Sequence, residues 1–464
     1  MTKFIRNIFF LLFLGFLSGC GQYSNEKQAK PQDTAIARLL VLDPGHFHAA
    51  LVQKTGYESI DTNVFVYAPA GKELDAYQSL VQQYNKREVQ PTKWKTETYS
   101  GNDFVAKMIA EKKGNVVVIA GNNRLKTEYI QQSIDAGLNV LADKPMVITA
   151  DKFEKLQRSF ENAGNKKVLL YDIMTERSEI TNILQRELIH IPELFGELQK
   201  GSAKEPAVFI ESVHYFYKNV SGKPLVRPTW FFDPTQQGEA IADVGTHLVD
   251  LVQWQCYPDS ILDFKKDINV YSGKIWPTPL TLSQFTSVTG ETVYPDFLKA
   301  YLIKDSILNA HGNGEMNYAL RGTHVKIIVR WNYKADEGGD THRSIVKGSN
   351  ATLEIRQTKK ENFKPVLYIR PTAKKGSADF EKNVKNTIAS LETKYPGITV
   401  EKAGMEWRVV IPSRYDVGHE AHFGQVMERY LEYLKQKKLP EWEVQNMISK
   451  YYTTTKALEI ASQR

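Results

Sequence analysis

Short apolar runs that favour β-strands alternate with helical segments from residue 37 to residue 171. Runs such as VVVIA at 116–120 are apolar throughout, which suits strands that are covered on both faces. This alternation predicts a Rossmann-like, doubly wound parallel sheet. The strand candidates are 37–42, 63–67, 115–120, 139–142 and 167–171, and helical spacing follows from about Ala49 and at 104–111, 127–136 and 151–163.

The pattern changes beyond about Asp172. Longer alternating runs predict a large, mainly antiparallel sheet with one solvated face. We therefore expect an α/β domain at 36–172 and an α+β domain at 173–464. The second domain has strand candidates at 207–217, 325–331, 344–355, 366–369 and 398–411, and helices near 179–189, 421–436 and 441–461.

The first 20 residues, MTKFIRNIFFLLFLGFLSGC, have the form of a secretory signal peptide. Leu17-Ser18-Gly19-Cys20 resembles the lipobox of bacterial lipoproteins, which implies removal of residues 1–19 and lipidation of Cys20. Polar residues 20–35 then form a flexible tether. We expect an exported lipoprotein, anchored in a membrane and facing the periplasm or the cell exterior. No twin arginine is present, so export of an unfolded chain without cofactor is expected.

Charge and cysteine content exclude several classes of protein. The 464 residues carry 60 basic and 53 acidic side chains, spread along the chain without a long basic run. No nucleic-acid-binding motif is found, so nucleic acid is not an expected partner. Only Cys20 and Cys256 occur. Lipidation of Cys20 leaves Cys256 alone, without an intramolecular disulfide.

Two segments carry acid–base chemistry. In AGLNVLADKPM (136–146), Pro145 stiffens the backbone and fixes where Lys144 points. In GEAIADVGTHLVDL (238–251), Asp243 and His247 are four residues apart and would share one helix face. A carboxylate beside an imidazole orients its tautomer and raises its basicity. The alternatives are a surface turn in the first segment, and a capping aspartate with a core histidine in the second.

Together, in this order and at this separation, the two segments resemble the glucose–fructose oxidoreductase/inositol dehydrogenase (Gfo/Idh/MocA) family. The resemblance runs from about residue 37 to the end of the chain. It implies NAD or NADP in the N-terminal domain, a carbohydrate or polyol substrate in the C-terminal domain, and a homo-oligomer built on the C-terminal sheet. The catalytic residues that it implies are Lys144, Asp243 and His247, and the cofactor contacts are Gly45, His46, Asn123, Asp143, Lys144 and Pro145.

The first turn departs from the family pattern. A GxGxxG turn lets the backbone approach a pyrophosphate, but here the turn reads Asp43-Pro44-Gly45-His46-Phe47-His48. Asp43 would put a negative charge near a phosphate. The second strand also ends without the acid that usually holds the adenosine ribose. These departures weaken the prediction of dinucleotide binding, but not that of the fold.

Further residues are candidates for substrate or metal contact. Histidine pairs at His46/His48 and at His419/His422 with Glu420 could bind a metal, but neither pair has the full spacing of a known site, so we assign none. Tyr171 could line the same cleft as the catalytic residues or have a structural role. The residues expected to contact a sugar are Arg177, Tyr215, Trp230 and, in the loop 338–342, His342.

Three functions remain open at this point. The first is a membrane-tethered oxidoreductase that acts on a carbohydrate or polyol with a tightly held nicotinamide cofactor. The second is an NAD-dependent glycosidase that works by oxidation and elimination. The third is a cofactor-free sugar-binding lipoprotein, which the missing glycines favour and which Lys144, Asp243 and His247 oppose.

Overall fold

The computed structural model describes residues 35–220, 223–372 and 378–463. The signal peptide, Cys20 and the tether up to Thr34 lie outside the described residues. Ala35–Arg464 form one compact unit, so the domain division expected near residue 172 stays a prediction, and we describe the unit by its two large sheets. No helix in the described part is long and apolar enough to cross a membrane.

The first sheet has six parallel strands in the described chain, in the order β3-β2-β1-β4-β5-β6. This is the doubly wound order, in which ligands bind beyond the carboxyl ends of the strands where the order reverses, here between β1 and β4. The expected Rossmann-like sheet is confirmed. Its strands are β1 (Leu39–Leu42), β2 (Asn63–Tyr67), β3 (Lys95–Tyr99), β4 (Val116–Ile119), β5 (Asn139–Asp143) and β6 (Leu170–Ile173).

Strand β3 and helix α2 were not predicted. In α2, Leu74, Tyr77 and Val81 recur at helical spacing and pack into the core. β3 reads KTETY at the edge of the sheet and is largely exposed, so it carries no apolar run. Helix α1 is four residues long and begins at His48, one residue before the start expected at about Ala49. The helices of this part are α1 (His48–Leu51), α2 (Lys72–Lys86), α3 (Phe104–Glu111), α4 (Lys126–Asp135) and α5 (Phe153–Lys166).

The second sheet has ten strands among the described residues, all paired antiparallel except β7 with β13. The order is β10-β12-β13-β7-β14-β15-β16-β18-β17, with β11 also beside β12. A mainly antiparallel sheet is therefore confirmed. Its strands are β7 (Val208–Tyr217), β10 (Ile268–Thr281), β11 (Leu302–Ile303), β12 (Ile307–Leu320), β13 (Thr323–Lys334), β14 (Thr341–Lys347), β15 (Ala351–Gln357), β16 (Val366–Pro371), β17 (Thr399–Ala403) and β18 (Glu406–Val410).

Two runs that we expected to form single strands each form a pair of antiparallel strands. The run at 344–355 turns between β14 and β15, and the run at 398–411 turns between β17 and β18. β10 and β12 were missed because prolines and glycines interrupt their apolar pattern. A separate two-stranded ribbon joins β8 (Asn219–Val220) to β9 (Lys223–Pro224).

Helices cover one face of the second sheet and build a second hydrophobic core with it. They include α6 (Ile180–Ile189), α7 (Pro192–Phe195), α8 (Val244–Cys256), α9 (Phe264–Asp267), α10 (Leu282–Thr289) and α11 (Ala378–Leu391).

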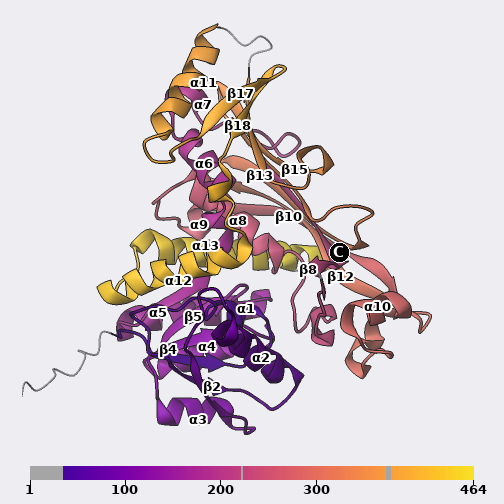
Figure 1. The fold of residues 1–464 in the computed structure, drawn as a ribbon. Helices are drawn as coiled ribbons and strands as arrows, with labels where there is room; N and C mark the ends of the chain where they lie inside the picture. The colour runs from indigo at the N-terminus through magenta and orange to yellow at the C-terminus, as the bar shows by residue number, and fades with distance from the viewer. Residues whose placement is uncertain (1–34, 221–222, 373–377, 464) are drawn as a thin grey trace, which may run out of the picture. The chain divides into compact units, whose positions relative to one another are not determined.

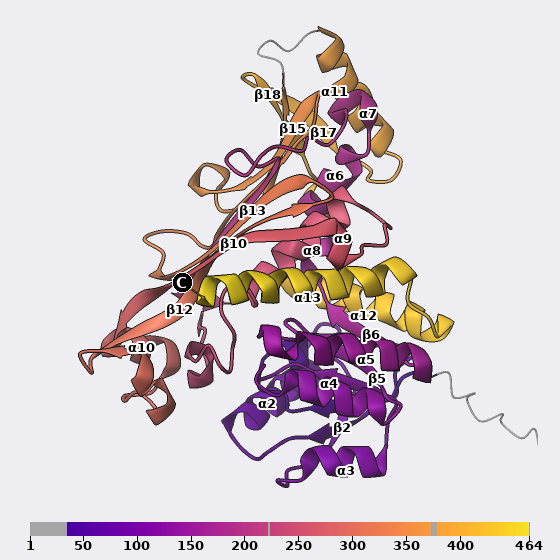
Figure 2. The same ribbon diagram turned by 180° about the vertical axis from the view of Figure 1, so that it is seen from behind.

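The last two helices lie between the sheets, as both views show (Figures 1 and 2). They are α12 (His419–Gln436) and α13 (Glu441–Ser462). Phe423 and Met447 belong to the core of the first sheet, whereas Ala457 and Leu458 belong to the second core. The end of the chain therefore joins the two cores.

Candidate active site

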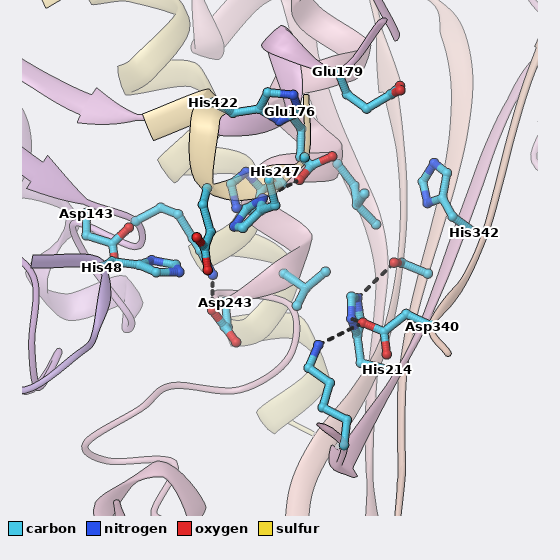
Figure 3. Close-up of a pocket in the computed structure, with 18 of the residues that line it drawn as sticks. His48, Asp143, Glu176, Glu179, His214, Asp243, His247, Asp340, His342 and His422 are labelled. Carbon is cyan, nitrogen blue, oxygen red and sulfur yellow. Dashed lines mark hydrogen bonds and ion pairs between the residues drawn. The ribbon is translucent and has the colours of Figure 1, made fainter. Parts of the chain in front are cut away.

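A cavity of about 600 Å³ lies beyond the carboxyl ends of β1, β4 and β5. The second sheet forms its opposite wall, and α8 and α12 form its sides (Figure 3). Its polar lining includes His46, His48, Asn123, Asp143, Lys144, Glu176, Glu179, Ser212, His214, Lys218, Arg227, Asp243, His247, Asp340, His342, His419 and His422.

Lys144 and Asp243 form an ion pair at the centre of this cavity, with both side chains 10% exposed. Burial alone would lower the pKa of Lys144, but the carboxylates of Asp243 and Asp143 outweigh it and raise this pKa. Burial likewise tends to raise the pKa of Asp243, but Lys144 outweighs it and lowers this pKa. The pair is therefore an ammonium held against a carboxylate.

The structure corrects the expected Asp243–His247 pair. Asp243 precedes the first residue of α8 and its carboxylate contacts Lys144, so it does not orient the imidazole. His247 Nδ1 is buried and has no hydrogen-bond partner among the described residues. Burial, followed by the positive charge of Lys144, holds the pKa of His247 well below its usual value. His247 is therefore a neutral imidazole that can accept a proton.

The two histidines of the first turn share one carboxylate. His46 Nδ1 and His48 Nδ1 lie 3.2 and 3.0 Å from Asp143 Oδ2. Burial, then the neighbouring His46, lowers the pKa of His48 to about 3. Among the described residues, His46, His48 and Asp143 form a group whose ligand atoms could hold a metal ion. Hydrogen bonds to Asp143 equally account for this geometry.

The first turn is not a glycine cradle for a pyrophosphate. The Gly45 N–H donates to Asp43 O at 2.8 Å, and the His46 N–H donates to Ala120 O at 3.1 Å. Both donors are therefore used within the protein. Gly45 and Pro145, which we expected to contact the cofactor, do not line the cavity.

The part of the cavity lined by Asn123 and His247, where the family resemblance places the cofactor, fits a polar ligand, and we call it the nicotinamide end. Asn123 Oδ1 and His247 Nδ1 are buried atoms of lining residues without a partner among the described residues. Buried polar atoms normally find partners, so a bound group is expected to supply them. At Gly121 a Cβ atom would stand 2.1 Å from Asp43 O. Only glycine fits there, where the turns after β1 and β4 meet.

Glu176 is a site residue that the sequence analysis missed. It lies in the short helix η2 (Thr175–Ser178), lines the cavity, and has Oε1 3.8 Å from His419 Nδ1. Burial, then the nearby Glu179, raises the pKa of Glu176 to about 7. A carboxyl group that titrates near neutrality suits general acid–base chemistry. No motif surrounds Glu176, so only its place in the fold reveals it.

We expect Glu176→Gln to change the pH dependence of stability. The unfolded carboxyl titrates near 4.5 and the folded one near 7, so the wild type loses stability as the pH rises between these values. Glutamine removes that loss. The melting temperature of Glu176→Gln, relative to wild type, should therefore rise across this range and stay level above it. Glu432→Gln, on the exposed face of α12, is the control for removal of a surface carboxylate. A difference for Glu176→Gln that does not change with pH would contradict the prediction.

The opposite wall carries a second group of linked polar side chains. Period-two alternation puts Ser212 and His214 of β7 on the same face as the buried Val208 and Ile210. Ser212 Oγ lies 2.8 Å from His214 Nε2, and His214 Nδ1 lies 3.0 Å from Asp340 Oδ2. Lys218 Nζ donates to the same oxygen of Asp340 at 3.1 Å. Figure 3 shows this group facing Asp243 and His247 across the cavity.

The structure places Trp230 and His342 in the cavity lining, as expected, but neither Arg177 nor Tyr215. Arg177 is 3% exposed. Its guanidinium group donates hydrogen bonds of 2.6–2.9 Å to Asp250 and Glu443. Because these buried acids hold it, it does not reach the cavity.

Other sequence candidates have structural partners. Tyr171 is buried and donates to Glu443, 3.2 Å away. Tyr215 fails to reach the cavity because it points to the other face of β7 from Ser212 and His214. Glu420 pairs with Lys54, while the rings of His419 and His422 lie 6.4 Å apart. Cys256 is a free, buried thiol whose pKa burial raises to about 12.

The fold and the site define an oxidoreductase with a nicotinamide-type Rossmann domain. Residues 66–171 match the model "Oxidoreductase family, NAD-binding Rossmann fold", and residues 184–462 match "Putative oxidoreductase C terminal domain". The chain belongs to the Gfo/Idh/MocA family and is an NAD(P)-dependent oxidoreductase. The Rossmann match begins after the unusual first turn.

Solved structures resemble the chain over most of its length. A crystal structure of "a putative oxidoreductase" from Parabacteroides merdae is 49% identical, covers 93% of this chain and 98% of that chain, and has a TM-score of 0.91. Levoglucosan dehydrogenase, in complex with NADH and levoglucosan, is 11% identical, covers 92% and 97%, and has a TM-score of 0.56. A 3-ketoreductase from Actinomadura kijaniata, in complex with NADP and TDP-benzene, is 12% identical, covers 89% and 94%, and has a TM-score of 0.52. No curated protein matches the sequence.

Proposed function

We propose that this protein is a membrane-tethered oxidoreductase that acts on a hydroxyl or keto group of a carbohydrate or polyol, with a tightly held nicotinamide cofactor. One observation carries the proposal. The ion-paired Lys144 ammonium and the neutral His247, with its unpartnered Nδ1, share one cavity at the switch point of the parallel sheet. The carbohydrate class is supported by levoglucosan dehydrogenase, which shares the fold and binds a sugar derivative.

Lys144, His247 and Asp243 have different roles in the proposed alcohol oxidation. Lys144 remains an ammonium beside Asp243, so it can donate a hydrogen bond to the reacting oxygen and hold it in place. The neutral His247 takes the hydroxyl proton as the hydride leaves the carbon, and it returns a proton in the reverse direction. Asp243 keeps Lys144 charged and oriented. A bound nicotinamide ring supplies the hydride acceptor.

The place of action follows from the N-terminal sequence alone. We propose export, cleavage before Cys20 and lipidation of its thiol and amine. Mass spectrometry of the membrane fraction should find a diacyl- or triacyl-modified Cys20 at the N-terminus. Outside the cytoplasm no dinucleotide pool is recycled, which favours a cofactor that is captured once and regenerated within each cycle.

The group on the opposite wall favours a second candidate, an oxidation–elimination glycosidase. Simple oxidation of an alcohol needs one base, but this cavity has a second proton-transfer group in Ser212, His214 and Asp340. Oxidation of one sugar carbon to a ketone acidifies the hydrogen on its neighbour. A base removes that proton, the glycosidic C–O bond breaks, and His214 supplies a proton to the leaving oxygen. Water then adds to the double bond, and the hydride returns to the ketone, so no net oxidant is used.

The first experiment is to look for dinucleotide in purified residues 35–464. We expect denaturation to release NAD or NADP, detectable by mass spectrometry, or the folded protein to bind one with micromolar affinity. A panel of sugars and glycosides then separates the two candidates. Accumulation of NADH or NADPH indicates net oxidation, whereas release of the aglycone without it indicates elimination. If no dinucleotide is released and none binds at millimolar concentration, both candidates are rejected and a sugar-binding protein remains.

A further inference from the structure

Arg227 is a buried cation that faces the cavity and has no carboxylate partner among the described residues. It precedes the short helix η3 (Thr229–Phe232), is 8% exposed, and lines the cavity. Its guanidinium group donates only to main-chain carbonyls, from Nε to Phe216 O at 2.9 Å and from Nη2 to Tyr215 O at 3.2 Å. In the described chain no carboxylate forms an ion pair with it. Nη1 has no hydrogen-bond partner there.

The two acids that act on this guanidinium group already form hydrogen bonds or ion pairs with other residues. Asp340 and Asp243 act on Arg227 electrostatically. However, Asp340 bonds to His214 and Lys218, and Asp243 bonds to Lys144. Burial lowers the pKa of Arg227 to about 10, which still leaves it charged at neutral pH. Burying a charge without a counter-charge is costly, so such groups usually serve a ligand.

Two aromatic rings pack against Arg227 and limit which part of its guanidinium group a ligand can reach. Its Cζ atom lies 4.7 Å from the ring centre of Phe231 and 4.9 Å from that of Trp331. These rings stabilise the cation, but they supply no counter-charge. Since they lie against the guanidinium group, the edge that bears Nη1 is left for a ligand. A carboxylate accepts two parallel hydrogen bonds from such an edge.

Charge and position select the kind of anion. Arg227, Lys218 and Asp340 together carry one net positive charge, which a carboxylate balances and a doubly charged phosphate would exceed. The groups that Arg227 contacts belong to β7, β13 and η3 rather than to the parallel sheet. The anion therefore belongs to the substrate side of the cavity, not to a dinucleotide pyrophosphate.

We propose that Arg227 binds a carboxylate on the carbohydrate, so that the substrate class is a sugar acid such as a uronic acid or its glycoside. This inference rests on the proposed function for the carbohydrate itself. It adds the charged group that fixes the orientation of the sugar in the cavity.

Matched pairs of sugars test the proposal, with no dinucleotide present. D-glucuronate and D-galacturonate differ from D-glucose and D-galactose only at the terminal carbon. Binding is read by calorimetry and by tryptophan fluorescence, since Trp331 packs against Arg227. We expect at least one acid to bind roughly tenfold or more tightly than its neutral partner, as charge-assisted hydrogen bonds allow. Arg158→Gln, which removes an exposed arginine outside the cavity lining, should keep this preference.

Two variants separate recognition from a structural role. Arg227→Gln should abolish the preference for the acid, and its ligand-free melting temperature should not fall, because the cost of burying the charge is lost. Arg227→Lys keeps the charge without the planar edge and should retain a weaker preference. Equal binding of acid and neutral sugars, a preference that survives Arg227→Gln, or no binding of any acid at millimolar concentration would overturn the proposal. Such a result leaves dinucleotide binding unaffected, so it is distinct from failure of the proposed function.

Discussion

Lys144→Met is expected to lower kcat about 100- to 1,000-fold, the range that one preorganised hydrogen-bond donor at the reacting oxygen contributes. The ammonium holds the reacting oxygen toward His247, and methionine keeps most of the side-chain volume without the charge. Dinucleotide binding should persist, because the remaining lining of the nicotinamide end, including Asn123, is intact. The measurement is kcat with the best sugar from the panel, together with dinucleotide affinity of the same preparation.

The variant also leaves Asp243 as a buried carboxylate without its cation, so a loss of stability must be separated from a loss of catalysis. Leaving one partner of a buried pair alone costs about 3–5 kcal/mol. Lys144→Met/Asp243→Asn removes both charges and should recover most of this stability without recovering activity. Recovery of activity in the double variant, or near-normal kcat in Lys144→Met, would show that Lys144 is only a structural partner.

Arg177→Met should destabilise the fold by about 3–5 kcal/mol, because it leaves the buried Glu443 without its cation and Asp250 with Lys450 alone. Arg177 bonds to Asp250 of α8 and to Glu443 of α13, and Lys450 bonds to Asp250 and Asp172 at 2.8 and 2.7 Å. This network connects the last strand of the parallel sheet to the helix that carries His247. The variant should therefore unfold at a lower temperature.

Arg158→Met is the matched control, since its partner Glu154 lies on an exposed helix face and both side chains are mostly accessible. Exposed pairs of this kind contribute about 0.3–0.5 kcal/mol. Denaturant midpoints and slopes of both variants give the comparison. A small change in the free energy of unfolding for Arg177→Met, together with a raised KM for sugar, would indicate that Arg177 contacts the substrate.

The elements that the sequence predicted are those with strong periodicity. β2 and α3 begin and end at the expected residues, and the buried strands β1, β4 and β5 are close to the expected bounds. In contrast, β3 is polar and exposed at the edge of the sheet, and β10 and β12 are interrupted by proline and glycine. These strands depend on pairing with distant strands, which no local pattern reports. Helix α2, in contrast, has a helical pattern at Leu74, Tyr77 and Val81 that the sequence analysis missed.

The sequence by itself determined the two kinds of sheet, the family resemblance, and the presence of Lys144, Asp243 and His247 in one site. Local periodicity and two motifs carry that information. Only the tertiary structure decided which groups pair: Asp243 with Lys144 rather than with His247, and Arg177 with core acids rather than with a sugar. It also brought Glu176, His214 and Arg227 to the cavity. The physical reason is that ion pairs and burial depend on residues about 70 to 270 positions apart in the chain, and a sequence pattern does not encode these distances.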